Sequence, residues 1–242
     1  MRTSIIIPSY NHDLKPCIQS VIKNTDLDKA DCEIIVVANG CKKETEDWAR
    51  SLNSPRIRLL STPEPMGFTK ATNWGIRESK GEFVVLLNDD CQILDWGGNG
   101  IWLEMLEAPF RADPKMGLTG STKDWWGDHK WFLVFFCTMI RRSLFDELGL
   151  LDEFFNPGAG EDCDFSIKAQ MAGWKIRQVP VENDLKWETA FPIYHLGHAT
   201  DWSKLDSVGA RNTAELERRY PRTETDRKFQ VDFSKGTLNG PL

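Results

Sequence analysis

The stretch Glu82-Phe83-Val84-Val85-Leu86-Leu87-Asn88-Asp89-Asp90-Cys91 indicates the fold. Its five consecutive apolar residues are typical of a strand buried on both faces of a parallel sheet. The strand then ends in an amide and two carboxylates, at the end where open α/β sheets bind their ligands. Adjacent carboxylates repel each other unless a cation lies near them. A divalent cation with oxygen ligands would fit this position, although such residues taken alone more often form a solvated turn.

The composition restricts the class of protein. The chain has 242 residues, 40% of them hydrophobic, which suffices for one large domain or two small ones. The net charge of −6 argues against binding nucleic acid through a general basic surface, so we expect no nucleic-acid partner. No apolar run approaches the ~18 residues of a membrane span. The N-terminus enters a strand directly, so we also expect no signal peptide.

The cysteines indicate the redox environment. Six cysteines are scattered along the chain without a C-x-x-C pair or a zinc spacing. Several lie beside apolar runs, so we expect reduced and mostly buried thiols in a cytoplasmic protein.

Strands and helices alternate through the first 98 residues. Apolar runs predict strands at 4–7, 33–37, 57–60 and 83–87, with helices between them, including one over 67–78. This order predicts an α/β fold with a right-handed, doubly wound, mostly parallel sheet covered by helices on both faces. The loops 8–11, 38–41 and 88–91 should line one crevice at its carboxyl edge. Neither G-x-G-x-x-G nor the P-loop pattern is present, which disfavours nicotinamide-type and P-loop chemistry.

The second half predicts a mixed arrangement of elements. The apolar run Trp131–Ile140 predicts one long strand, and Ser143 is a candidate N-cap for a helix over 142–148. Other predicted elements are helices at 101–110, 162–173 and 203–220, and strands at 116–119 and 175–179. Residues 221–242 form a polar tail.

Two carboxylates follow a glycine-containing loop at 156–160. Asp162 can cap the helix that follows, a role for which Asp164 competes. It can equally act as a general base, because partial desolvation beside Glu161 would raise its pKa. The residues alone leave both interpretations open.

Histidines and tryptophans supply two further candidates. His195 and His198 follow a short apolar segment, and a neutral imidazole could complete a metal site begun by Asp90, with a structural role as the alternative. Trp125 and Trp126 lie in a loop that looks poorly suited to burying two indoles. They could stack on a sugar ring or pack beneath the loop as a satellite core.

Taken in order, these motifs resemble glycosyltransferase family 2, whose members have the GT-A fold. The resemblance runs from Ser4 to about Thr200. It rests on the segments Ile5-Ile6-Ile7-Pro8-Ser9-Tyr10-Asn11, Glu33 to Gly40, Gly67 to Ile76, Leu86-Leu87-Asn88-Asp89-Asp90, Gly160-Glu161-Asp162-Cys163-Asp164-Phe165 with Ala172-Gly173-Trp174, and His195-Leu196-Gly197-His198-Ala199-Thr200.

The resemblance implies an inverting, metal-dependent glycosyltransferase that uses a nucleotide-diphosphate sugar. Its acceptor would be a glycan or lipid-linked glycan, as in polysaccharide biosynthesis, which is compatible with peripheral membrane association. Asp162 would be the catalytic base, and Asp90 and His195 would bind Mn²⁺ or Mg²⁺. Acceptor residues would be Glu161, Trp125 and Trp126. The nucleotide sugar would contact Pro8, Tyr10, Asn11, Asn39, Lys70, Asn88 and Asp89.

The resemblance also implies one GT-A domain over residues 1–220, with a nucleotide-binding half (1–98) and an acceptor-binding and catalytic half (99–220). Two positions depart from the family pattern. Ala38 replaces a frequent acid, so Asn39 would contact the nucleotide base, and Asn88 replaces the first acid of D-x-D, as in rhamnosyltransferase-like relatives. The alternatives are a non-catalytic binding module on the same fold and a sugar nucleotidyltransferase.

Overall fold

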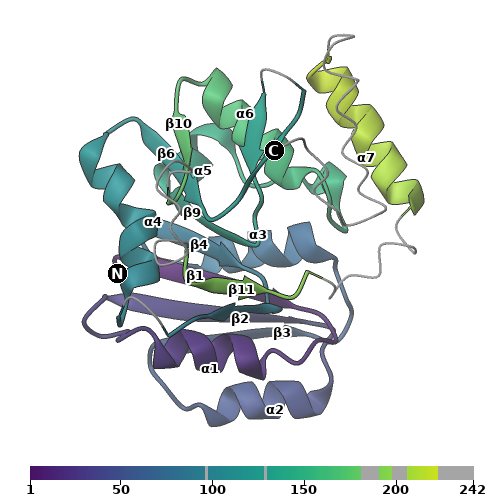
Figure 1. The fold of residues 1–242 in the computed structure, drawn as a ribbon. Helices are drawn as coiled ribbons and strands as arrows, with labels where there is room; N and C mark the ends of the chain where they lie inside the picture. The colour runs from purple at the N-terminus through teal and green to yellow at the C-terminus, as the bar shows by residue number, and fades with distance from the viewer. Residues whose placement is uncertain (96–97, 128–129, 181–190, 198–205, 223–242) are drawn as a thin grey trace.

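A central sheet of seven strands organises the computed structural model, which describes residues 1–95, 98–127, 130–180, 191–197 and 206–222. The strand order is β10-β6-β9-β4-β1-β2-β3 (Figure 1). The strands are β1 (Thr3–Ser9), β2 (Cys32–Asn39), β3 (Ile57–Thr62), β4 (Phe83–Leu87), β6 (Met116–Gly120), β9 (Cys137–Arg141) and β10 (Lys175–Gln178).

The sheet is mostly parallel, as predicted. Strands β3, β2, β1 and β4 pair in parallel, and β10 is parallel to β6. Strand β9 runs antiparallel between β4 and β6. Because Leu87 at the end of β4 pairs with Cys137 at the start of β9, the residues just before β9 lie at the carboxyl edge of β4.

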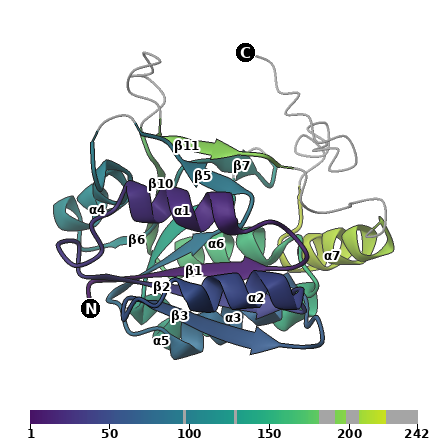
Figure 2. The same ribbon diagram turned by 90° about the horizontal axis from the view of Figure 1, so that it is seen from below.

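Helices cover both faces of the sheet (Figures 1 and 2). Phe83, Val85 and Leu87 of β4 pack into the core beneath α1 (Lys15–Lys23), α2 (Lys43–Ser51) and α4 (Ile101–Ala112). Val84 and Leu86 pack into the opposite core, beneath α3 (Phe68–Glu78), α5 (Ser143–Leu148) and α6 (Glu161–Met171). Each of these five side chains is at most 1% exposed, which contributes roughly 1.5–3 kcal/mol per residue and explains why β4 has no polar face.

Helix α3 approaches β1 closely through Gly75. A β-carbon at Gly75 would lie 2.4 Å from Cγ2 of Ile6, so a larger residue would push the helix away from the sheet. Ala71, Gly75 and Ile76 are buried on this helix, whereas Phe68 at its start is partly exposed.

Two small antiparallel pairs lie outside the main sheet. Strand β5 (Cys91–Ile93) pairs with β11 (Ile193–His195), and β7 (Lys123–Trp125) pairs with β8 (Trp131–Leu133). The short helix η1 (Glu153–Phe155) precedes α6, and α7 (Asp206–Arg219) follows the main sheet in the chain. A third apolar cluster joins α6 and α7, through Trp126, Phe132, Phe155, Cys163, Ile167, Leu216 and Tyr220.

The prediction of one strand over Trp131–Ile140 is wrong. The segment forms β8 and β9 in different sheets, joined by residues 134–136. Most of the segment is buried, but an apolar run alone does not distinguish a strand from a partly buried connection. Ser143 is also not an N-cap: it is the first residue of α5, whose N-cap Arg142 makes no capping side-chain bond.

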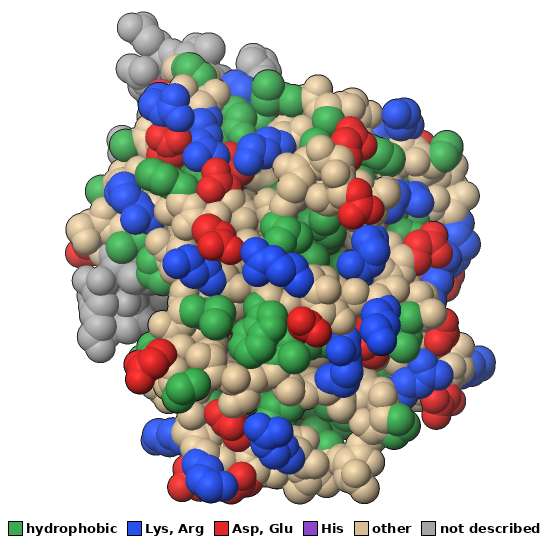
Figure 3. All heavy atoms as spheres, turned by 180° about the vertical axis from the view of Figure 1, so that it is seen from behind, with side chains coloured by type: hydrophobic (Ala, Val, Ile, Leu, Met, Phe, Trp, Pro, Cys, Tyr) green, Lys and Arg blue, Asp and Glu red, His purple; other side chains and the backbone are tan. Residues whose placement is uncertain are grey.

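The cysteines and the charged surface complete the description of the fold. Five cysteines are buried, Cys41 is partly exposed, and all six are free. No helix within the described ranges is long and apolar enough to span a membrane. The face opposite to the view of Figure 1 carries interspersed acidic and basic side chains (Figure 3). The start of the predicted 203–220 helix and most of the 221–242 tail lie outside the described residues.

Candidate active site

Asp90 lies at the carboxyl edge of β4 and is held by backbone groups from distant segments. The N–H of Asn88 donates to the carbonyl of Phe136 at 2.9 Å, just before β9. The N–H of Leu196 donates to the Asp90 carbonyl, and the N–H of Gly197 donates to Asp90 Oδ2, both at 3.1 Å. The turn after β4 is therefore fixed in position by β9 on one side and by the end of β11 on the other.

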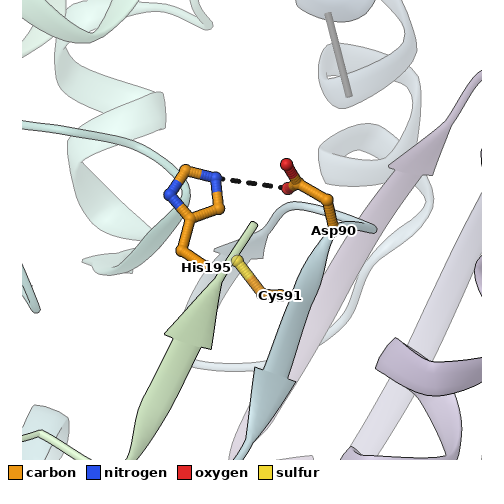
Figure 4. A group of neighbouring side chains, drawn as sticks. All are labelled: Asp90, Cys91 and His195. Carbon is orange, nitrogen blue, oxygen red and sulfur yellow. Dashed lines mark ion pairs between the residues drawn. The ribbon is translucent and has the colours of Figure 1, made fainter. Parts of the chain in front are cut away.

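His195 faces Asp90 across the β5–β11 pair (Figure 4). Its Nε2 lies 3.2 Å from Asp90 Oδ1. The Phe136 ring stacks on the imidazole with centroids 4.1 Å apart and planes 15° apart, which orients the ring. Burial opposes ionisation of Asp90, but the neighbouring His195 outweighs it and lowers the pKa of the carboxyl below its usual value. Asp90 is therefore an ionised ligand candidate at neutral pH.

The atoms around Asp90 fit a hard divalent cation. Asn88 Oδ1 is buried without a hydrogen-bond partner in the described part of the chain, an unfavourable state unless a ligand satisfies it, and Asp90 Oδ1 is buried with His195 Nε2 at 3.2 Å. With His195 Nε2 they offer two oxygens and one nitrogen, which suit Mg²⁺ or Mn²⁺. The Cys91 thiol also lies close to the side chains of Asp90 and His195. Burial strongly raises the pKa of this thiol, and a neutral thiol is a poor ligand for such an ion.

Asp89 points to a different neighbour, His12, which the sequence did not single out. The Nδ1 atom of His12 lies 3.9 Å from Asp89 Oδ1. Burial is the largest influence on Asp89 and raises the pKa of its carboxyl. A single histidine in the loop after the first strand gives no sequence signal, because its proximity to Asp89 depends on β1 and β4 lying side by side.

A cavity of about 460 Å³ joins the Asp90 site to the start of α6. Asp162 and Glu161 line it together with Asp90. Gly160 precedes them with φ +108°, and a β-carbon there would lie 2.9 Å from the Phe155 ring, so glycine alone fits this turn into α6. Gly160 is the N-cap residue of α6 and makes no side-chain cap, which removes that role from Asp162 and Asp164. Asp162 Oδ1 instead accepts from the N–H of Cys163 at 2.7 Å.

Both acidic residues at the start of α6 resist ionisation. Glu161 is 5% exposed, and burial followed by repulsion from Asp162 raises the pKa of its carboxyl. Burial also raises the pKa of Asp162, and repulsion from Asp124 adds to this, against hydrogen bonds from the backbone of Cys163 and Phe135. A carboxylate with a raised pKa is a better proton acceptor, which suits a general base.

Asp164 has a structural role. It is 1% exposed and interacts with Arg219 (2.9 Å), Lys168 (2.7 Å) and the Tyr220 hydroxyl (2.8 Å). These contacts connect α6 to α7 and satisfy a carboxylate that would otherwise be costly to bury.

Helix α7 also holds the loop that precedes Asp162. The Nδ2 group of Asn212 donates to the carbonyls of Phe155 (3.3 Å), Gly158 (3.0 Å) and Ala159 (2.6 Å), and Asn212 is 2% exposed. The sequence did not identify Asn212, because its partners lie more than 50 positions away.

The two tryptophans point in different directions. Trp126 is 4% exposed, lines the cavity, and donates through Nε1 to the carbonyl of Tyr220 at 2.9 Å. Trp125 is 46% exposed and is not among the residues that line the cavity. Neighbouring residues of an extended chain point to opposite sides. Trp126 therefore packs in a satellite core, the third apolar cluster, whereas Trp125 does not.

The predicted nucleotide residues lie around the ends of β1 and β2 and at the start of α3. Tyr10 is exposed, Asn11 has a positive φ of 52°, and Lys70 is exposed on α3. Asn39 is buried, and its Oδ1 accepts from the N–H of Met66 at 2.6 Å, so that oxygen holds the loop after β3. Pro8 is buried in β1. Of the predicted nucleotide-sugar residues, Asn88 lines the cavity with Asp90 and His195.

Residues 4–122 match the family model described as Glycosyl transferase family 2. The similarity to that family lies in the N-terminal part of the chain. The chain is also similar over 96% of its length to the uncharacterized protein y4gI of Sinorhizobium fredii (25% identity), and over 36% of its length to the glycosyltransferase AglE of Haloferax volcanii (33% identity). The chain spans 27% and 30% of the lengths of these two relatives.

The chain has the GT-A fold. The mannosyltransferase PcManGT of Pyrobaculum calidifontis, solved with GDP-Man and Mn²⁺, superposes with a TM-score of 0.59 at 20% identity. The superposition covers 74% of this chain and 55% of the mannosyltransferase. The predicted fold class is thereby confirmed.

Proposed function

We propose that this chain is a metal-dependent, inverting glycosyltransferase that moves a sugar from a nucleotide-diphosphate donor to a hydroxyl of a glycan or lipid-linked glycan. One observation carries the proposal. A single cavity contains an unsatisfied oxygen of Asn88, the facing side chains of Asp90 and His195, and the carboxyls of Glu161 and Asp162. Since strands from both halves of the chain join one sheet, residues 1–220 act as one domain with this cavity between the halves.

The donor diphosphate requires a counter-charge. The described lining of the cavity contains neither lysine nor arginine. Asp90 and His195 would therefore hold Mn²⁺ or Mg²⁺, with the amide oxygen of Asn88 beside them. When bound, this ion neutralises the leaving diphosphate. The Phe136 ring and the Gly197 N–H keep His195 and Asp90 in the required orientation.

Asp162 would serve as the base. Its carboxylate accepts the proton of the acceptor hydroxyl while that oxygen forms a bond to the anomeric carbon. The bond from that carbon to the diphosphate oxygen breaks on the opposite face and leaves its electron pair on the diphosphate. The transition state resembles an oxocarbenium ion, and one displacement inverts the configuration. Glu161 would hydrogen-bond the acceptor.

The remaining predicted residues surround this centre. Pro8, Tyr10, Asn11, Asn39, Lys70 and Asp89 would contact the nucleotide sugar. Trp126 supplies an aromatic wall for an acceptor sugar, because it lines the cavity. Trp125 does not line the cavity, and its exposed ring would contact the acceptor outside it.

A non-catalytic nucleotide-sugar module is the second candidate, and one observation favours it. Ala38 supplies no acid, and Asn39 Oδ1 already accepts from Met66, which reduces the groups that can bind a nucleotide base. The presence of both Asp90 and Asp162 in one cavity favours catalysis instead.

A panel of UDP-, GDP- and dTDP-sugars tests the proposal, with Mn²⁺ present and nucleoside diphosphate release as the readout. Metal-dependent release with at least one donor is expected. Saturable binding of a donor without release would identify a binding module. Pyrophosphate production from a nucleoside triphosphate and a sugar phosphate would identify a nucleotidyltransferase.

A further inference from the structure

The cavity is strongly acidic. Its described lining includes the carboxyl groups of Asp90, Asp124, Glu161, Asp162 and Asp206. The basic group among these lining residues is His195, which already faces Asp90. These acidic groups contrast with the interspersed acidic and basic side chains on the face that Figure 3 shows.

Glu161 has a buried oxygen atom that a bound molecule could satisfy. Its side chain is 5% exposed, and its Oε2 atom has no hydrogen-bond partner among the described residues. Because burial and the neighbouring Asp162 raise the pKa of Glu161 to about 8, its carboxyl is protonated near neutral pH and can donate to, or accept from, a hydroxyl of a bound molecule. Asp90 and His195 line the same cavity and would hold the metal.

Asp124 adds a third carboxyl on the same side. It lies on β7, lines the cavity, and accepts from the N–H of Trp125 at 2.7 Å. Burial raises the pKa of Asp124, and its charge raises the pKa of Asp162. Neither the family resemblance nor the sequence pattern assigned this residue a role.

The walls between these acids are apolar. Phe68, Trp126, Phe132, Phe136 and Leu216 line the same cavity. Apolar walls exclude water and lower the local dielectric constant, which strengthens repulsion between the acids and any anion placed among them. Hydroxyl groups and ammonium groups, in contrast, donate hydrogen bonds to carboxylates.

We infer that the acceptor side of the cavity, formed by Asp124, Glu161 and Asp162, selects a sugar that carries no anionic group near its accepting hydroxyl. Neutral sugars and amino sugars fit, whereas uronates and phosphosugars are rejected. The inference rests on the proposed function, because it assigns this side to the acceptor. The same cavity would then bind the donor diphosphate through the metal held by Asp90 and His195, and would exclude an anion near Asp124, Glu161 and Asp162.

Matched 4-nitrophenyl glycosides test the inference by binding, without requiring turnover. Saturation-transfer NMR with Mg²⁺ and UDP present would compare the glucoside, the glucosaminide and the glucuronide. We expect the glucoside and the glucosaminide to bind at least about tenfold more tightly than the glucuronide. In Asp124→Asn this ratio should narrow by roughly tenfold, as expected for the loss of one nearby charge.

Asp146→Asn is the matched control, because it removes the same charge from an exposed position on α5 and should leave the ratio unchanged. Glu161→Gln provides a second variant at the site. Equal binding of glucuronide and glucoside, binding of none of the three glycosides, or an unchanged ratio in a folded Asp124→Asn protein would overturn the inference. Failure of the proposed function has a separate sign, namely no nucleotide release from any donor.

Discussion

His195 is the residue whose role depends most on its surroundings. Its Nε2 lies 3.2 Å from Asp90 Oδ1, and its ring is stacked on Phe136. We predict that His195→Ala weakens Mn²⁺ binding by at least about tenfold, similar to the loss of an ordered metal-site partner. His198→Ala, at a position outside the described residues, should have the smaller effect. Titration calorimetry with Mn²⁺ and nucleoside diphosphate measures both, and equal, negligible effects would assign both histidines to structural roles.

Glu161 should make the protein less stable at high pH. Burial and Asp162 raise the pKa of Glu161 in the folded state above the unfolded value of roughly 4.3. Between these two pKa values the folded state binds more protons than the unfolded state, so the free energy of unfolding falls as pH rises. We predict that Glu161→Gln removes this loss.

Thermal melting of the two proteins between pH 4 and pH 8 checks this prediction. The difference in melting temperature, Glu161→Gln minus wild type, should increase as pH rises. Glu64→Gln, at an exposed position, is the control and should show no such trend. A wild-type protein that gains stability over the variant as pH rises would show that the folded protein favours ionised Glu161.

At the scale of elements, α7 positions the catalytic loop. Asn212 donates to three carbonyls of the segment that leads to Asp162, at Phe155, Gly158 and Ala159. We predict that Asn212→Ala destabilises the protein by about 1–3 kcal/mol, because buried carbonyls lose their donor. Because the loop carries Asp162, kcat should fall several-fold while the KM for the donor changes little.

Chemical denaturation and steady-state kinetics measure the two effects of Asn212→Ala. Arg218→Ala, which removes an exposed pair with Glu215 on the same helix, is the matched control and should cost less than about 1 kcal/mol. A change in donor KM with unaltered kcat would instead place Asn212 on the donor side.

The sequence predicted elements well where local pattern and burial agree. Strand β4 has an apolar run bounded by Gly81 and Asn88, and both boundaries hold in the structure. The apolar run 131–140 led to a wrong prediction, because residues 134–136 form a connection, in which Phe135 is buried and Val134 and Phe136 are partly exposed. His12, Asp124 and Asn212 gave no signal, because each acquires its neighbours through contacts distant in sequence.

At the scale of the whole molecule, the described lining of the cavity carries acidic side chains and one histidine. Asp90, His195 and the acids at the start of α6 line the same cavity, with neither lysine nor arginine in the described lining. We predict that transfer requires a divalent cation, and that Asp90→Ala abolishes transfer while the protein stays folded, because no other described lining group can offset the diphosphate charge. Circular dichroism confirms folding. Full transfer in excess chelator would show that the reaction does not require a divalent cation.

Asp162→Asn tests the central claim most directly. The substitution keeps the shape of the side chain and removes its ability to accept a proton. We predict that the Asp162→Asn protein binds Mn²⁺ and the donor as the wild type does, yet transfers sugar at least about a hundredfold more slowly. The wild-type rate should fall as pH drops below the raised pKa of Asp162. Proton NMR of the wild-type product should show an inverted anomeric centre. Normal transfer by Asp162→Asn, or a product that keeps the donor's anomeric configuration, would contradict single displacement with Asp162 as the base.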